Sequence, residues 1–269
     1  MSVLKELLKE LSEYVSVKDY SDEFFDKYYA FRIKGNLQPV KYPHIPELDK
    51  FVGIERQKTV ILRNTEQFVK GYPANDVLLW GARGTGKSSL VKALLGIFGS
   101  KGLRLIQITK YDIPEIAYLY EILRGKKKRF ILFFDDLSFE PKEESFKLLK
   151  SLMEGDIEER PPNVLVYATS NRRNLIPESY QEEKFPEESM QERISLVERF
   201  GIRLYFPPMD KNLYLEAVSL YLKDYGLSLN ESIEREAIMW ATERGSFSGR
   251  VAYQFVKDFV GKLKLVNSS

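Results

Sequence analysis

Eight residues, Gly81 to Ser88, combine three glycines with a lysine and a serine in an order that can hold phosphate. They fit the pattern G-x-x-x-x-G-K-[ST] at every fixed position, between an apolar run ending at Trp80 and a helix-like run. Glycines let successive backbone N–H groups point at phosphate oxygens, and the start of a helix adds a favourable dipole. Because both flanking segments match, the pattern favours a triphosphate-binding loop over an ordinary glycine-rich turn.

The residue types in this loop predict separate roles. Lys87 is expected to reach the β and γ phosphates as a point charge, and the Ser88 hydroxyl is expected to bind Mg²⁺. Ser89 closes the segment and is expected to lie on the helix without touching phosphate. The predicted nucleotide-binding residues of the loop are Gly81, Ala82, Arg83, Gly84, Thr85, Gly86, Lys87, Ser88 and Ser89.

Two aspartates follow a second apolar run, "FILFF", which spans Phe130 to Phe134. Such a run is typical of a strand buried on both faces. At its carboxyl end, Asp135 is expected to hold Mg²⁺ directly or through water, and Asp136 to orient or deprotonate the attacking water. The alternative is that one of the aspartates only caps the next helix.

Three more polar side chains are candidates for the same site. Asn171 ends the apolar run "VLVYA", and the carboxyl edge of a parallel sheet faces the ligand crevice, where an amide can hold the lytic water. Arg199 precedes a final strand and Arg250 begins the last helix, and a forked guanidinium suits phosphate recognition. The alternatives are a polar strand end for Asn171 and a surface ion pair for each arginine.

Strand and helix patterns alternate in the part of the chain that carries these residues, which predicts a parallel sheet covered by helices on both faces. Helices are expected over 53–71, 88–98, 111–123 and 141–154, and strands over 77–80, 103–108, 130–134 and 164–168, with a final strand after Arg199. Beyond Pro207 and Pro208 the pattern becomes helical near 210–225, 230–244 and 248–264. The predicted fold is therefore an α/β phosphate-binding-loop sheet sandwiched by helices, followed by a small α-helical lid.

The chain is predicted to divide into an N-terminal helical segment and linker (1–50), a nucleotide-binding α/β domain (51–208) and a helical lid (209–269). Residues 1 to about 34 are expected to form two helices. The second would carry an aromatic cluster, Phe24 to Phe31, that packs into the core rather than around a ligand. Three prolines, Pro39, Pro43 and Pro46, then predict an extended linker.

The composition excludes other chemistries. The 269 residues include no cysteine and one histidine, so disulfides and thiol catalysis are excluded and a histidine-based metal site is disfavoured. Hydrophobic residues make up 43% and charged residues 30%, as in a globular protein with a sizeable core, and the net charge of +2 gives no overall attraction to nucleic acid or membranes. No apolar run reaches 18 residues, and charges interrupt the N-terminus, so we expect a cytoplasmic protein with no membrane partner.

Together these motifs resemble the AAA+ ATPases from about Phe51 to Val260. Gly81–Ser88 resembles Walker A and Phe130–Asp136 resembles Walker B. The resemblance implies that Asn171 is sensor 1, that Arg199 in "ERFG" is an arginine finger and that Arg250 in "SGR" is sensor 2. Val52 and Gly53, in "VGIERQ", match the segment that covers adenine in this superfamily.

More narrowly, "GIERQK", "DDLSFE" and "ATSNRR" resemble a bacterial family of predicted AAA+ ATPases catalogued as a domain of unknown function. The match covers nearly the whole chain. Asp136 departs from the glutamate that is usual in the superfamily, and aspartate is one methylene shorter. The resemblance implies ATP and Mg²⁺ as ligands and a homo-oligomeric ring or filament in which Arg199 acts in trans.

The sequence leaves the use of ATP open among three hypotheses. The first is a motor or switch that acts on nucleic acid or its loading machinery, because the "RFG" and "SGR" forms resemble those of Holliday-junction motors. The second is a protein remodelling factor, although no glycine follows Tyr111 in the segment where unfoldases carry their pore loop. The third is a nucleotide-dependent protein-interaction switch with little turnover.

Overall fold

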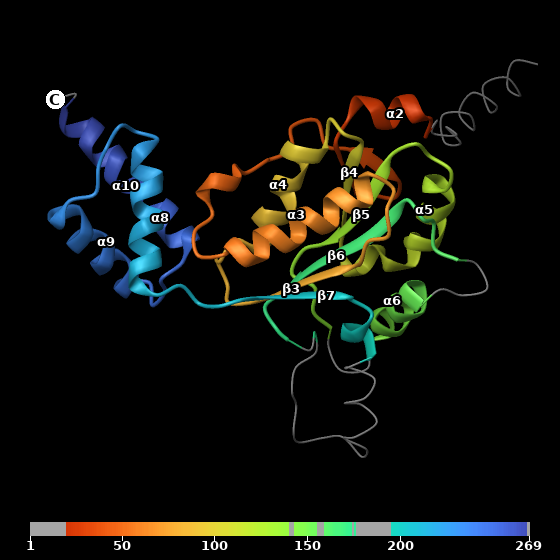
Figure 1. Ribbon diagram of the computed structural model, residues 1–269. Helices are drawn as coiled ribbons and strands as arrows, with labels where there is room; N and C mark the ends of the chain where they lie inside the picture. Colours follow the sequence, from red (N-terminus) through yellow and green to blue (C-terminus); the bar gives the residue numbers. More distant parts are fainter. Residues whose placement is uncertain (1–19, 140–142, 155–158, 174, 176–194, 268–269) are drawn as a thin grey trace, which may run out of the picture.

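A computed structural model describes residues 20–139, 143–154, 159–173, 175 and 195–267. Its centre is a seven-stranded sheet in the order β2-β1-β4-β5-β6-β3-β7 (Figure 1). Every neighbouring pair is parallel except β1 and β2, which are antiparallel. The strands are β1 (Ala30–Ile33), β2 (Leu37–Pro39), β3 (Val77–Gly81), β4 (Leu103–Ile108), β5 (Arg129–Phe134), β6 (Val164–Ser170) and β7 (Ile202–Phe206).

Helices cover both faces of this sheet, as predicted. On one face α3 (Glu55–Val69) and α4 (Lys87–Phe98) pack on one core cluster. On the other face η2 (Lys110–Glu115), α5 (Ile116–Leu123) and α6 (Glu144–Glu154) pack on a second cluster. Successive residues of β5 alternate between the two clusters, so the all-apolar run of that strand is explained by burial on both sides.

Three helices after β7 pack on one another beside the sheet (Figure 1). They are α8 (Lys211–Lys223), α9 (Glu231–Glu243) and α10 (Gly249–Asn267). Asp210 caps α8 by accepting a hydrogen bond from the Leu213 N–H at 2.8 Å, and Asn230 caps α9 in the same way at 3.0 Å from Ile233. These caps start the first two of the three helices predicted for this part of the chain.

Most of the predicted elements are confirmed within one to a few residues, and the N-terminal prediction is partly wrong. The helix predicted to run to about residue 34 is only α2 (Asp22–Lys27), and the chain then enters strand β1. The linker also contains β2 and a short 3-10 turn, η1 (Leu48–Lys50). Pairing of β1 with β4 supplies hydrogen bonds from a distant segment, and local helix propensity cannot foresee them. The other helix predicted near the N-terminus lies outside the described residues.

The predicted helix over 111–123 begins as the 3-10 segment η2 and becomes α-helical only from Ile116. The aromatic cluster is core, as predicted: Phe25 and Phe31 are fully buried, and the ring centroids of Phe25 and Phe130 lie 4.9 Å apart. Among the described residues, no helix combines the length and the apolar character needed to cross a membrane.

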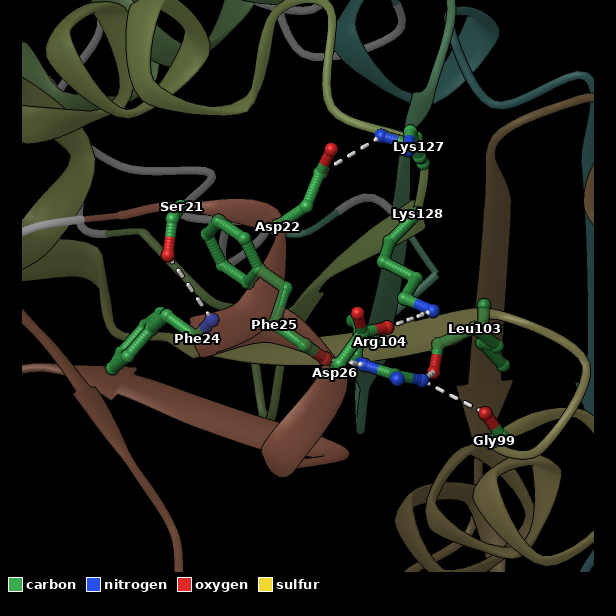
Figure 2. A network of polar contacts seen from close by, with 10 residues as sticks. All are labelled: Ser21, Asp22, Phe24, Phe25, Asp26, Gly99, Leu103, Arg104, Lys127 and Lys128. Atoms are coloured by element: carbon green, nitrogen blue, oxygen red, sulfur yellow. Dashed lines mark hydrogen bonds and ion pairs between the residues drawn. The ribbon is translucent and has the colours of Figure 1, made fainter.

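A buried arginine joins the N-terminal segment to the sheet. Arg104 of β4 donates from Nε to the Phe25 carbonyl at 2.5 Å and from Nη1 to the carbonyls of Gly99 and Leu103 at 2.8 and 2.7 Å (Figure 2). Burial lowers the pKa of its guanidinium. Nearby, Lys128 forms an ion pair with Asp26 on the surface of α2 (Figure 2). Arg104 therefore ties α2 both to β4 and to the residue that ends α4.

We predict that Arg104→Met lowers the free energy of unfolding by about 2–4 kcal/mol, because three carbonyl oxygens lose their buried donor. The matched control is Lys128→Met, which removes a cation that pairs at the surface of the same helix and is expected to cost at most about 1 kcal/mol. Urea unfolding followed by circular dichroism measures both variants. Equal losses in the two variants would contradict a structural role for the Arg104 network.

Candidate functional site

The segment Gly81–Ser88 connects β3 to α4. Three of its positions have backbone conformations that favour glycine. Gly81, Gly84 and Gly86 have φ values of 132°, 74° and 94°, in the region that side chains rarely adopt. A Cβ on Gly81 would lie 2.1 Å from the Phe206 carbonyl oxygen. The loop thus closes tightly against β7 and leads into α4, which begins at Lys87.

Lys87 is held at the centre of this loop. Its side chain is buried, with 6% of the residue exposed, and Nζ donates to the carbonyl oxygens of Gly81 at 2.9 Å and Ala82 at 2.6 Å. Nζ also donates to Oδ1 of Asn171 at 3.2 Å. Burial, followed by the guanidinium groups of Arg83 and Arg250, lowers the pKa of Lys87, and the carboxylates of Asp135 and Asp136 oppose this shift. Several cationic groups therefore converge on this loop, as phosphate binding requires.

Asp135 lies next to Ser88, where the sequence predicted a metal site. The Ser88 hydroxyl donates to Asp135 Oδ1 at 2.5 Å, so the two predicted Mg²⁺ ligands are adjacent. The described residues hold no group of three or more histidine, cysteine, aspartate or glutamate side chains that could bind a metal without a substrate. Mg²⁺ favours one or two protein oxygens together with phosphate oxygens and water, and a hydroxyl beside a carboxylate fits that preference.

Asp136 and Asn171 also lie together at the edge of the sheet. Asn171 Nδ2 donates to Asp136 Oδ1 at 2.6 Å, and Asn171 Oδ1 accepts from Lys87, so the amide links the cation to the second carboxylate. Asp136, two residues after β5 ends, has a φ of 59°, and its side chain is exposed. A carboxylate that is exposed beside a phosphate-binding loop is placed to contact a water molecule.

The start of α10 borders the loop. A Cβ added to Gly84 would lie 2.9 Å from Ser248 and 3.6 Å from the Cβ of Arg250. Ser248 Oγ accepts a hydrogen bond from the Val251 N–H at 3.3 Å and so caps this helix. Arg250 is exposed on the first turn of α10. The structure therefore brings Arg250 to the loop, as expected for a residue that contacts phosphate.

Val52 and Gly53 lie between the sheet domain and the lid. Val52 is buried in the core cluster of the lid helices, and a Cβ on Gly53 would lie 2.9 Å from Leu213 of α8. The neighbouring Phe51 ring would lie 2.9 Å from a Cβ on Gly86. The segment predicted to cover adenine thus borders the phosphate-binding loop.

Arg199 is not brought to the loop of its own chain. Strands β3 and β7 run parallel, with Val77 opposite Ile202 and Gly81 opposite Phe206. Arg199 precedes β7, whereas the loop follows β3. Because the two strands are parallel, the length of one strand, about 13 Å, separates Arg199 from the loop. Arg199 is exposed at the far end of the sheet.

Two residues at the site are absent from the candidates that the sequence supplied. Thr169 of β6 is buried; its Oγ1 donates to Asp135 Oδ1 at 3.0 Å and accepts from the Asp136 N–H at 2.9 Å. Lys92 of α4 places Nζ 3.6 Å from Asp135 Oδ2. Helical spacing from Ser88 to Lys92 could have indicated the lysine, because residues four apart share a face. No periodicity indicates that the Thr169 hydroxyl points across to β5.

The loop, the carboxylates at the end of β5 and the helical lid define a phosphate-binding-loop protein with the AAA+ architecture. The chain belongs to the family described as "Protein of unknown function (DUF815)", whose model matches residues 26–263.

Solved structures with this fold include RuvB of Thermotoga maritima and ORC1 of Aeropyrum pernix. RuvB superposes with a TM-score of 0.56 at 18% identity, over 82% of this chain and 66% of RuvB. ORC1, solved in complex with DNA, superposes with a TM-score of 0.56 at 14% identity, over 83% of this chain and 62% of ORC1. At these identities the likeness shows the fold alone.

A curated relative is similar over a shorter stretch. ORC1-type DNA replication protein 2 of Halobacterium salinarum is 34% identical over 77 residues, which are 29% of this chain and 28% of that protein. The chain therefore spans less than two thirds of the length of each of these relatives.

We predict that Thr169→Val lowers the free energy of unfolding by about 1–3 kcal/mol, because the Asp136 N–H loses its acceptor and Asp135 loses a donor. Valine keeps the shape of threonine, so packing changes little. The matched control is Thr59→Val on the exposed side of α3, whose hydroxyl donates to the Glu55 carbonyl, and it is expected to change stability by less than about 0.5 kcal/mol. Urea unfolding compares the variants, and an equal effect of the two would refute a bridging role for Thr169.

Proposed function

We propose that the protein binds ATP with Mg²⁺ and hydrolyses it. The observation that carries this proposal is the convergence of Lys87, the Ser88–Asp135 pair and the Asp136–Asn171 pair at the carboxyl edge of one parallel sheet. These groups lie at the start of α4 and directly after strands β5 and β6, which are far apart in the sequence. They supply a phosphate-binding cation, a pair of metal ligands and a carboxylate that can accept a proton.

Each residue has a role that its position supports. The backbone N–H groups of Gly84 to Ser88 would bind phosphate oxygens, and Lys87 would bind the β and γ phosphates. Ser88 and Asp135 would hold Mg²⁺, which neutralises phosphate charge when bound. Asp136 would orient water and accept its proton, while Asn171 fixes the carboxylate from one side. Arg250 would add positive charge from the lid. Val52 and Gly53 would lie against adenine.

We predict that Lys87→Ala abolishes tight ATP binding and that Asp136→Asn keeps binding but slows hydrolysis at least about tenfold. The first variant removes the buried cation of the loop, whereas the second keeps the shape of the side chain and removes its basicity. Binding of a fluorescent ATP analogue and phosphate release measure the two steps separately. Tight binding by Lys87→Ala would argue against the site, and unchanged turnover in Asp136→Asn would remove Asp136 from the mechanism.

We further propose that Arg199 acts on ATP held by a neighbouring subunit in a homo-oligomeric ring or filament. Its exposed position at the opposite end of β7 from the loop suits contact with a second copy. A guanidinium supplied in trans can provide a large part of a phosphoryl-transfer rate.

Arg199→Ala is therefore expected to preserve ATP binding and to lose the hydrolysis that rises with protein concentration. Phosphate release at several protein concentrations, together with native mass measurement with and without ATP, gives the comparison. Hydrolysis that does not depend on protein concentration and does not change in the variant would exclude the trans role.

The client that we favour is a nucleic acid. The similar structures include RuvB described as a "Holliday junction branch migration motor" and ORC1 in complex with DNA. Two short basic runs lie at residues 126–129 and 172–173. In the first, Lys128 pairs with Asp26, and in the second, the Arg173 guanidinium lies 5.7 Å from the Trp80 ring centroid. Filter binding to duplex and single-stranded DNA over a salt series tests this assignment.

A protein remodelling role is the second candidate, and one observation favours it. Tyr111 is 82% exposed on η2, which Thr109 and Asp112 hold with reciprocal capping hydrogen bonds. An exposed ring on a turn that directly follows β4 can contact a client chain. Stimulation of hydrolysis by a protein, and not by DNA, would favour this role over the first.

A nucleotide-dependent interaction switch would instead bind ATP without turnover.

A further inference from the structure

The carboxylate of Asp135 has different partners on its two oxygens. Oδ1 accepts from the hydroxyls of Ser88 at 2.5 Å and Thr169 at 3.0 Å. Oδ2 faces the ammonium group of Lys92 at 3.6 Å. One oxygen is thus directed toward the predicted metal ligand Ser88, and the other toward the Lys92 ammonium group.

The position of Lys92 follows from the helix that carries the phosphate-binding loop. It lies four residues after Ser88 on α4, so both side chains project from the same face. The ion pair is partly shielded from water, because 34% of the Lys92 side chain and 27% of the Asp135 side chain are exposed. Water reduces the attraction in such a pair without abolishing it.

We propose that Lys92 is a positioning residue that shares Asp135 with Mg²⁺ and thereby lowers the affinity of the site for the ion. The inference rests on the proposed ATPase function and concerns how the same site is tuned. An ammonium group on Oδ2 would neutralise part of the carboxylate charge with which Asp135 attracts the metal. It also repels the divalent cation directly. Such a site binds Mg²⁺ firmly only when phosphate oxygens add their negative charge, which couples metal binding to nucleotide binding.

The test is the Mg²⁺ dependence of nucleotide binding in the full-length protein, with a fluorescent ATP analogue as the probe. We expect Lys92→Met to lower the Mg²⁺ concentration at half-saturation by about three- to fivefold, the size expected for loss of a partly exposed ion pair. We expect Lys92→Arg to retain the wild-type value, because it keeps the charge. Affinity for the analogue in EDTA is expected to stay unchanged.

The matched control is Lys101→Met, which removes an exposed cation after the end of α4, about 18 Å along the helix from the loop. Its Mg²⁺ dependence is expected to equal that of the wild type. If Lys92→Met folds poorly, Lys92→Gln provides the same loss of charge. Thermal unfolding with increasing Mg²⁺ at saturating nucleotide gives a second measurement that does not depend on turnover.

The outcomes separate this inference from the proposed function. If the wild-type protein binds no nucleotide at any Mg²⁺ concentration, the proposed function fails and the inference fails with it. If the wild type binds and Lys92→Met needs as much Mg²⁺ or more, only the role of Lys92 is overturned. A lower Mg²⁺ requirement in Lys92→Met, with wild-type behaviour in Lys92→Arg and Lys101→Met, supports it.

Discussion

The hydrogen bonds that join Ser88, Asp135 and Thr169 hold the candidate site to the sheet, and the placement of the other site residues depends on them. Ser88 lies on α4, Asp135 directly follows β5 and Thr169 lies on β6, and they meet because the carboxyl ends of neighbouring parallel strands lie at one edge. A one-residue shift in the β5–β6 register would turn the Thr169 hydroxyl to the opposite face. In the observed register Phe134 lies opposite Ala168, so the buried strands β5 and β6 end together and the sheet positions the polar site.

Two buried cations show how the fold uses backbone carbonyls in different ways. Arg104 donates to three carbonyl oxygens that join α2, β4 and the end of α4, which fixes the N-terminal segment. Lys87 donates to two carbonyls of its own loop and to Asn171, which keeps its ammonium group at the loop. A guanidinium satisfies a rigid, multidirectional set of acceptors, whereas an ammonium group on a flexible stem suits a site that must also receive a ligand.

The lid contributes to the site through packing as much as through charge. Val52 belongs to the lid's core cluster, and Lys50 forms an ion pair with Asp224 at the end of α8, so η1 and the residues after it connect the sheet domain to the lid. Ser248 and Arg250 then meet Gly84 at the start of α10. Glycine is therefore required at position 84 for two reasons. Its backbone conformation disfavours other residues, and Ser248 of the lid leaves no room for a side chain.

The sequence by itself predicted strands β3 to β7 and the candidate residues at the ends of those strands, because these signals are local. Glycine spacing, apolar runs and the polar residues that end them indicated Lys87, Ser88, Asp135, Asp136 and Asn171 as candidates without knowledge of the fold. Only the tertiary structure decided that residues after α2 form strands at the sheet edge, because their hydrogen bonds go to β4. It alone placed Thr169 between two aspartates and Lys92 against the far oxygen of Asp135. Those contacts depend on strand register and helix placement, which no short stretch of sequence encodes.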